Sequence, residues 1–126
     1  MTQVKGRLTL RSGEKHVRMT ALFDTGATLT YINETVAEKI GFNPYPKPKT
    51  VPLAVLEKEA EVLGDITVSL EIDGCLMPRR ETVEVIGDLR FDAIVGLDII
   101  EKYDVILDTK NGRAKLRNCP PEVVLI

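Results

Sequence analysis

The chain has 126 residues, a mass of 14.0 kDa and 44% hydrophobic residues, which predicts a single globular domain spanning residues 1–126. Its 17 basic and 19 acidic side chains give a formal net charge of −2, which argues against nucleic acid or an anionic membrane as a partner. No apolar run reaches the roughly 18–20 residues of a membrane span, and residues 1–20 carry charges in place of a signal core, so we expect a soluble, cytoplasmic protein.

Runs of β-branched and aliphatic residues, separated by turn residues, predict a mostly antiparallel β protein. The first two runs lie on either side of a turn at Gly13. Later runs flank Asp73-Gly74 and Asn111-Gly112, dipeptides that favour tight hairpin turns because glycine tolerates positive φ. The paired runs are 4–10 with 16–23, 62–72 with 76–86, and 105–108 with 113–117.

Two short helices are expected between these strands. Asn33 is suited to cap a helix that ends at Gly41. A second helix is predicted over 97–102, directly after Gly96. The apolar stripe of the first helix consists of Val36, Ala37 and Ile40.

Four prolines fall between Pro44 and Pro52. Proline has no N–H to donate to a neighbouring strand, so it is excluded from the middle of a sheet. The segment is therefore predicted to be an extended loop or a sheet edge inside the single domain.

The few cysteine and histidine residues limit the chemistry that the chain can perform. Cys75 and Cys119 lack CxxC spacing and a companion histidine cluster, which favours two free thiols over a disulfide and argues against a zinc site. His16 is the one histidine and lies in an alternating run, so we interpret it as an ordinary strand residue. We expect no metal and no other cofactor.

Two segments carry the chemical signal. In ALFDTGATLTYI, residues 21–32, a carboxylate lies at the corner between a strand and a loop, although Asp, Thr and Gly are also common in ordinary turns. In FDAIVGLDII, residues 91–100, apolar residues lead into Gly96, which permits close approach of another backbone segment.

Together these segments resemble the single-domain retropepsin-like aspartic proteases of clan AA, in which a strand bearing a glycine, here Gly96, crosses beside an Asp-Thr-Gly loop. The resemblance covers residues 4–117 and implies an acid-protease β-barrel with one or two short helices that forms a homodimer. DTGATLTYINETVAEKIG, residues 24–41, is especially similar to cellular and prokaryotic members. Viral members tend to have an internal ion pair that this chain lacks, because it has Thr28 and Leu97 at those positions.

The resemblance also assigns roles to the residues of the first segment. Asp24 matches the catalytic aspartate, and Thr25 matches the residue whose hydroxyl bonds across to its symmetry mate. Gly26 and Ala27 match the turn that lines the substrate cleft, and Thr28 matches a position that is often Ser or Thr in cellular relatives.

Hydrolysis of a peptide bond without a metal or a covalent nucleophile needs one group to accept a proton and another to donate one. The chain has one Asp-Thr-Gly, so the pair must come from a two-fold homodimer in which Asp24 meets its own copy. Two carboxylates about 5 Å apart repel by roughly 3 kcal/mol at an effective dielectric of about 20, so the pair retains one proton, as is general for aspartic proteases. Activity is expected from acid to near-neutral pH. We interpret the other nearby acidic residues as helix caps or surface charges: Asp92, Asp98 and Asp104.

In this family a β-hairpin flap covers the cleft, and the matching region of this chain is 50–61. Viral flaps are rich in glycine, whereas the tip here has none, which predicts a less mobile or differently shaped flap. The expected flap residues are Val55, Leu56, Glu57 and Lys58.

The chain ends in four apolar residues, 123–126. Left in water they would form an aggregation-prone edge, so we expect them in the subunit interface. The alternative is that they cover the sheet of their own subunit.

The sequence therefore predicts an aspartic endopeptidase that acts on peptides or unfolded protein as a homodimer. One alternative is a proteolytically inactive, dimeric peptide-binding or adaptor module of the same fold, which the glycine-free flap favours. Another is a purely structural β domain.

Overall fold

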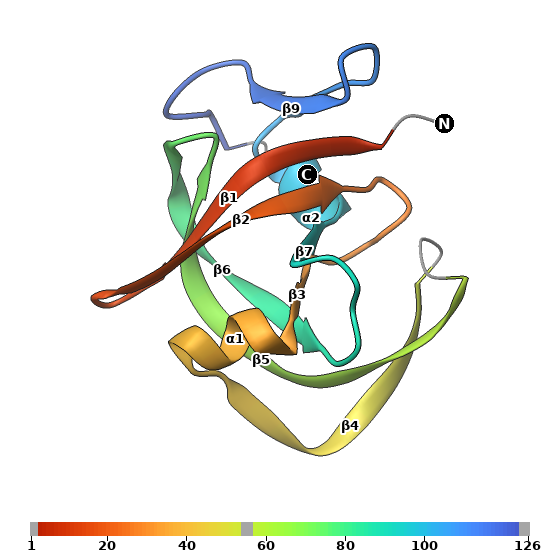
Figure 1. Ribbon diagram of the computed structural model, residues 1–126. Helices are drawn as coiled ribbons and strands as arrows, with labels where there is room; N and C mark the ends of the chain where they lie inside the picture. Colours follow the sequence, from red (N-terminus) through yellow and green to blue (C-terminus); the bar gives the residue numbers. More distant parts are fainter. Residues whose placement is uncertain (1–2, 54–56, 124–126) are drawn as a thin grey trace.

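The computed structural model describes residues 3–53 and 57–123 (Figure 1). These residues form the mostly β fold that the sequence predicts, with two short helices. In chain order the elements are β1 (Val4–Ser12), β2 (Lys15–Phe23), β3 (Tyr31–Asn33), α1 (Glu34–Ile40), β4 (Asn43–Leu53), β5 (Lys58–Ile72), β6 (Cys75–Ile86), β7 (Ala93–Val95), α2 (Leu97–Lys102), β8 (Val105–Asp108) and β9 (Arg113–Leu116).

The three hairpins predicted from turn sequences are confirmed: β1 pairs with β2, β5 with β6, and β8 with β9, all antiparallel. Each turn contains a glycine in the left-handed region of φ, at Gly13, Gly74 and Gly112. Asp73 also has positive φ, in accord with the Asp-Gly dipeptide that precedes β6.

Six strands close into a barrel in the order β1, β5, β6, β3, β7, β2, because β5 pairs with β1 as well as with β6. Alternate residues of β5 are buried from Ala60 to Ile72, the period of two that places one face of a strand toward the core. β9 is joined to the outside of the barrel by a single parallel pair, Lys5 with Arg113, and β8 lies beyond it.

Both helices occur where the sequence predicts them. Asn33 caps α1 by accepting a hydrogen bond from the Thr35 N–H at 2.9 Å, and Gly41, with a φ of 92°, ends the helix. The predicted stripe is buried: Val36, Ala37 and Ile40. Neither helix in the described part of the chain is long and apolar enough to cross a membrane.

The proline-rich segment is β4, the end strand of the sheet. Within the described residues it pairs with β5 alone, so a missing N–H on its outer side interrupts no hydrogen bonds to another strand. Figure 1 shows β4 and β5 as a long, curved hairpin that extends away from the barrel. The prediction of a sheet edge is confirmed.

The prediction of two free thiols is wrong, because Cys75 and Cys119 form a disulfide. The turn before β6 and the segment after β9 are distant in sequence, but the fold brings the two Cα atoms to 5.9 Å. Sequence spacing does not report such a tertiary distance. The bond fixes the segment that follows β9 to the β5–β6 hairpin.

We predict that Cys119→Ser lowers the free energy of unfolding in urea by about 2–4 kcal/mol, because the disulfide joins residues 44 apart and restricts the unfolded chain. A reducing agent should destabilise the wild-type protein by a similar amount and leave the variant unchanged. Two titratable thiols in unreduced, denatured protein would contradict the assignment.

Candidate active site

Asp24 begins the loop that connects two strands on either side of β7. β7 lies between β2 and β3 in the sheet, parallel to β2 and antiparallel to β3. The Asp24 loop, residues 24–30, therefore passes over the end of β7. Its first residue is held there by a hydrogen bond of 2.9 Å from the Asp24 N–H to the Val95 carbonyl.

The Asp24 side chain is partly buried and is oriented by its own loop. The Gly26 N–H donates to Asp24 Oδ1 at 2.9 Å, and the Ala27 N–H donates to the Asp24 carbonyl at 3.1 Å. Thr25 and Thr28 are exposed, whereas Ala27 is buried. The loop thus presents a carboxylate, with one oxygen held by a backbone donor, at the end of a rigid sheet.

Gly96 lies directly beneath this loop. A Cβ atom at this position would be 2.2 Å from the Leu29 carbonyl oxygen and 2.6 Å from that of Ala27. Because the glycine permits this close approach, the next N–H groups along the chain reach the loop: Leu97 donates to the Ala27 carbonyl at 2.8 Å. Residues 95–97 therefore contact the loop at both Asp24 and Ala27.

Asp98 accepts from one N–H in the first turn of α2, as a capping residue would, but it is not a surface charge, and its side chain also binds the Asp24 loop, which the sequence did not indicate. Its side chain is partly buried and accepts a hydrogen bond of 2.8 Å from the Thr30 hydroxyl. The N–H groups of Thr30 and Ile99 also donate to it, at 3.3 and 2.9 Å. Burial raises the pKa of Asp98, and the hydrogen bonds from Thr30 and Ile99 oppose that shift.

The other two acidic residues near this segment match their interpretation. Asp92 is exposed, and Asp104 forms an exposed ion pair with Arg117 at 3.1 Å. The signal that distinguishes Asp98 in the sequence is its position inside an apolar run, immediately after Gly96 and Leu97. The sequence does not reveal the partner of Asp98, because Thr30 lies 68 residues earlier and only the fold brings the two together.

The expected flap region forms a hairpin, with Thr50 paired to Glu61 and Leu53 paired to Lys58. Glu57 lies in the turn directly before the returning strand and Lys58 begins that strand, and both are exposed. The expected flap residues Val55 and Leu56 lie outside the described residues.

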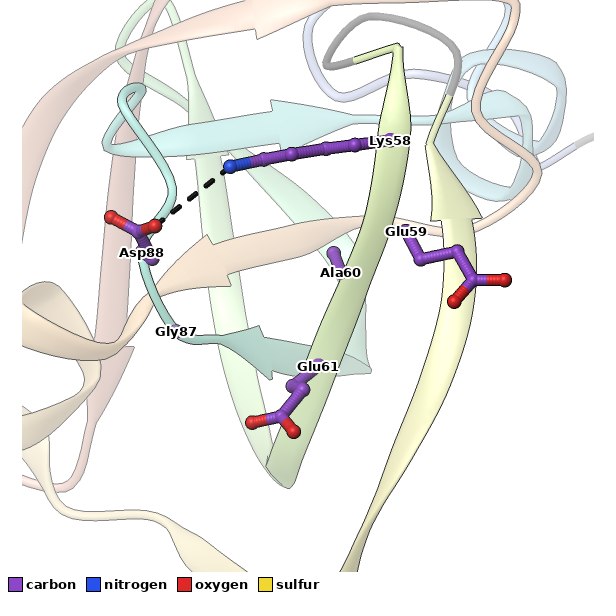
Figure 2. Close-up of a pocket in the computed structure, with 6 residues that line it drawn as sticks. All are labelled: Lys58, Glu59, Ala60, Glu61, Gly87 and Asp88. Carbon is purple, nitrogen blue, oxygen red and sulfur yellow. Dashed lines mark ion pairs between the residues drawn. The ribbon is translucent and has the colours of Figure 1, made fainter.

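A cavity of about 280 Å³ lies between this hairpin and the segment that follows β6. Figure 2 shows the Lys58 side chain extending across to Asp88, with Nζ and Oδ2 3.8 Å apart, while Glu59 points away. The Gly87 N–H also donates to the Glu61 carbonyl at 3.3 Å. The cavity borders the hairpin, and no residue of the Asp24 loop lines it. The exposed ion pair is a weak link between the two segments.

The described site offers one carboxylate per chain for proton transfer. His16 is exposed near the turn of the β1–β2 hairpin, at the opposite end of β2 from Asp24. Within residues 3–53 and 57–123, no group of three or more His, Cys, Asp or Glu side chains could hold a metal ion. A reaction that needs both a proton donor and a proton acceptor would therefore require a second copy of the loop.

Residues 8–99, more than half of the chain, match the model of a family described as aspartyl protease. The retroviral protease-like domain of Ddi1 from Leishmania major has a similar structure, with a TM-score of 0.68 and 22% identity over 99% of this chain and 96% of that one. A retropepsin-like aspartic protease from Rickettsia conorii has a TM-score of 0.59 and 22% identity over 84% of each chain. No curated protein sequence matches the chain. The fold is retropepsin-like, as predicted.

We predict that Gly96→Ala lowers the free energy of unfolding by about 2–4 kcal/mol, because the new methyl group would overlap two backbone carbonyls that cannot rotate away. The matched control is Gly87→Ala, whose Cβ would meet the flexible side chains of Leu63, at 3.2 Å, and Glu34, at 3.9 Å, and should cost less than about 1 kcal/mol. Urea denaturation of both variants checks this. Equal stability of the two would contradict the proposed contact.

Proposed function

The chain belongs to the aspartyl protease family, and from this premise we propose that it hydrolyses peptide bonds with two Asp24 carboxyls contributed by two copies of the chain. The observation that carries the proposal is the partly buried Asp24 at the end of β2, with Oδ1 held by the Gly26 N–H. The substrates that suit this chemistry are peptides and unfolded proteins, because their backbone can enter a cleft in extended form.

The proposed reaction uses both carboxyls of the pair and the proton that they share. The ionised Asp24 accepts a proton from a water molecule, whose oxygen attacks the carbonyl carbon of the peptide bond. The protonated Asp24 donates its proton to the carbonyl oxygen. The amine then takes a proton from the pair as the C–N bond breaks, and one hydroxyl of the tetrahedral intermediate gives its proton to the pair as it becomes the carbonyl of the product acid. The pair therefore ends with one shared proton, as it began.

The neighbouring residues are proposed to support this pair. Thr25 is exposed in the single chain, so its hydroxyl is accessible to a second copy across a two-fold axis. Ala27 and Gly96 set the shape of the loop, and Thr28 is an exposed residue within it. The β4–β5 hairpin is proposed to act as the flap.

A cytoplasmic location remains a prediction from the amino-acid sequence. The disulfide weighs against it, because such bonds are typical of oxidising compartments.

The glycine-free end of the β4–β5 hairpin also supports a second candidate function, an inactive dimeric module that binds peptides. Such a module would retain the fold and the Asp24 loop but would bind a peptide without cleaving it. The two functions differ in whether Asp24 is needed for turnover.

We predict that Asp24→Asn reduces cleavage of an unfolded protein between about pH 4 and 7 by about 10²–10⁴-fold, because the amide cannot exchange a proton with water. The matched control is Asp92→Asn, which makes the same change at an exposed acid outside the Asp24 loop and should retain activity. Cleavage that survives Asp24→Asn would refute the mechanism. Peptide binding without cleavage by the wild-type dimer would support the inactive module.

We also predict that the active species is a homodimer stabilised by residues 123–126. Val123 itself packs against the core of its own subunit, and residues 124–126 lie outside the described residues. Removing 124–126 leaves Cys119 and Val123 in place and should lower the dimer fraction, measured by analytical ultracentrifugation, in parallel with the activity. An unchanged dimer mass would favour the alternative in which these residues cover their own sheet. A wild-type enzyme that cleaves as a monomer would contradict the paired mechanism.

A further inference from the structure

We propose that Asp98 is a positioning residue, which holds the Asp24 loop in its active shape through Thr30 and needs a carboxylate to do so. Asp98 lies in the first turn of α2, and Thr30 is the last residue of the loop. The catalytic part of this inference rests on the proposed function, whereas the structural part does not.

The hydrogen bonds at Thr30 have only one consistent direction. The Gly96 N–H donates to Thr30 Oγ1 at 3.1 Å, so the hydroxyl oxygen acts as an acceptor. The hydroxyl proton is then free to be donated to Asp98 Oδ1, at 2.8 Å. The Gly96 N–H thus donates to Thr30, and the Thr30 hydroxyl donates to Asp98. Asp98 must therefore act as an acceptor.

A carboxylate satisfies all three contacts at Asp98, and an amide does not. Oδ1 accepts from the Thr30 hydroxyl and the Ile99 N–H, and Oδ2 accepts from the Thr30 N–H at 3.3 Å. An asparagine that kept the first two bonds would place its NH₂ group against the Thr30 N–H, so two donors would face each other. Asparagine therefore has nearly the shape of aspartate here, but at the contact with the Thr30 N–H it offers a donor in place of an acceptor.

Hydrogen bonds hold the Asp98 side chain, and no ion pair contributes within the described residues. Lys102, on the same helix, pairs with the buried Glu81 at 2.6 Å instead. Among the described residues, Asp98 therefore acts toward the loop as a hydrogen-bond acceptor and not as a member of an ion pair.

The contact between Thr30 and Asp98 is one of several that connect the loop to residues 95–98. Asp24, at the start of the loop, donates to Val95, and Thr28 accepts from the Asp98 N–H at 3.1 Å. Thr30, at the end of the loop, is held by the Asp98 side chain. Both ends of the loop are therefore fixed to one short segment, residues 95–98, and loosening one end changes the direction in which the Asp24 carboxyl points.

The kinetic test compares Asp98→Asn with Asp104→Asn. The control makes the same chemical change at an exposed position that has a positive φ of 50°, which asparagine tolerates. We expect Asp98→Asn to lower kcat by about 10–100-fold with KM changed by less than about twofold, because it misplaces the reacting groups and leaves the remote substrate contacts unchanged. The control should keep both constants. Wild-type kcat in Asp98→Asn would overturn the proposal.

A second pair of variants tests the link through Thr30 and remains informative if Asp98→Asn does not fold. Thr30→Val keeps the side-chain shape but removes the hydroxyl, whereas Thr30→Ser retains it. We expect Thr30→Val to lower kcat and Thr30→Ser to restore most of the loss. The double variant Asp98→Asn/Thr30→Val should lose less than the product of the two single effects. Equal activity of the Thr30→Val and Thr30→Ser variants would overturn the proposal.

Hydrogen exchange separates this inference from the proposed function, because it needs no activity. The Ala27 amide donates to the Asp24 carbonyl within the loop, and the Leu97 amide donates from α2 to the Ala27 carbonyl. In Asp98→Asn we expect both amides to exchange about tenfold faster or more, with unchanged exchange at barrel amides such as that of Val68. Unchanged exchange at Ala27 and Leu97 would overturn the positioning role even in an active enzyme. Faster exchange at these amides in a protein that never cleaves peptides would support the positioning role and refute only the protease function.

Discussion

The close approach of Gly96 to the loop above it is the contact on which the rest of the site depends. A side chain at this position would collide with two backbone carbonyls, so only glycine allows β7 and α2 to lie under the loop. That approach brings the Leu97 N–H to the Ala27 carbonyl and leaves Asp24 at the end of β2. The site is thus positioned by backbone contacts between the Asp24 loop and residues 95–98.

Local features of the fold could be predicted from sequence because they depend on residues close together in the chain. The Asp73-Gly74 turn, the Asn33 cap and the proline-rich edge strand each follow from the conformational limits of a few neighbouring residues. The disulfide could not be predicted, because it depends on where barrel closure places the β5–β6 turn relative to the segment after β9. The pairing of β5 with β1 is likewise a property of the whole barrel.

The candidate site likewise contains residues that the sequence identifies and residues whose role depends on the fold. Asp24 and Gly96 stand out because their flanking apolar runs and a known family pattern identify them. The sequence indicates a cap or a surface charge at Asp98, because its partner, Thr30, lies 68 residues earlier at the end of the Asp24 loop and carries no local signal. The structure shows a partly buried acceptor that also joins the loop to α2. Viral relatives tend to have an ion pair in this part of the site, and here hydrogen bonds between Thr30 and Asp98 link the loop to the helix.

The central claim is that two identical carboxyls meet at a two-fold axis and share a proton. A crystal structure of the assembly formed in solution would test this most directly, through the distance between the two Asp24 carboxyl groups. The account predicts a separation of about 3–5 Å, short enough that both groups cannot be ionised together. An assembly in which each Asp24 faces bulk solvent, far from its copy, would contradict the account.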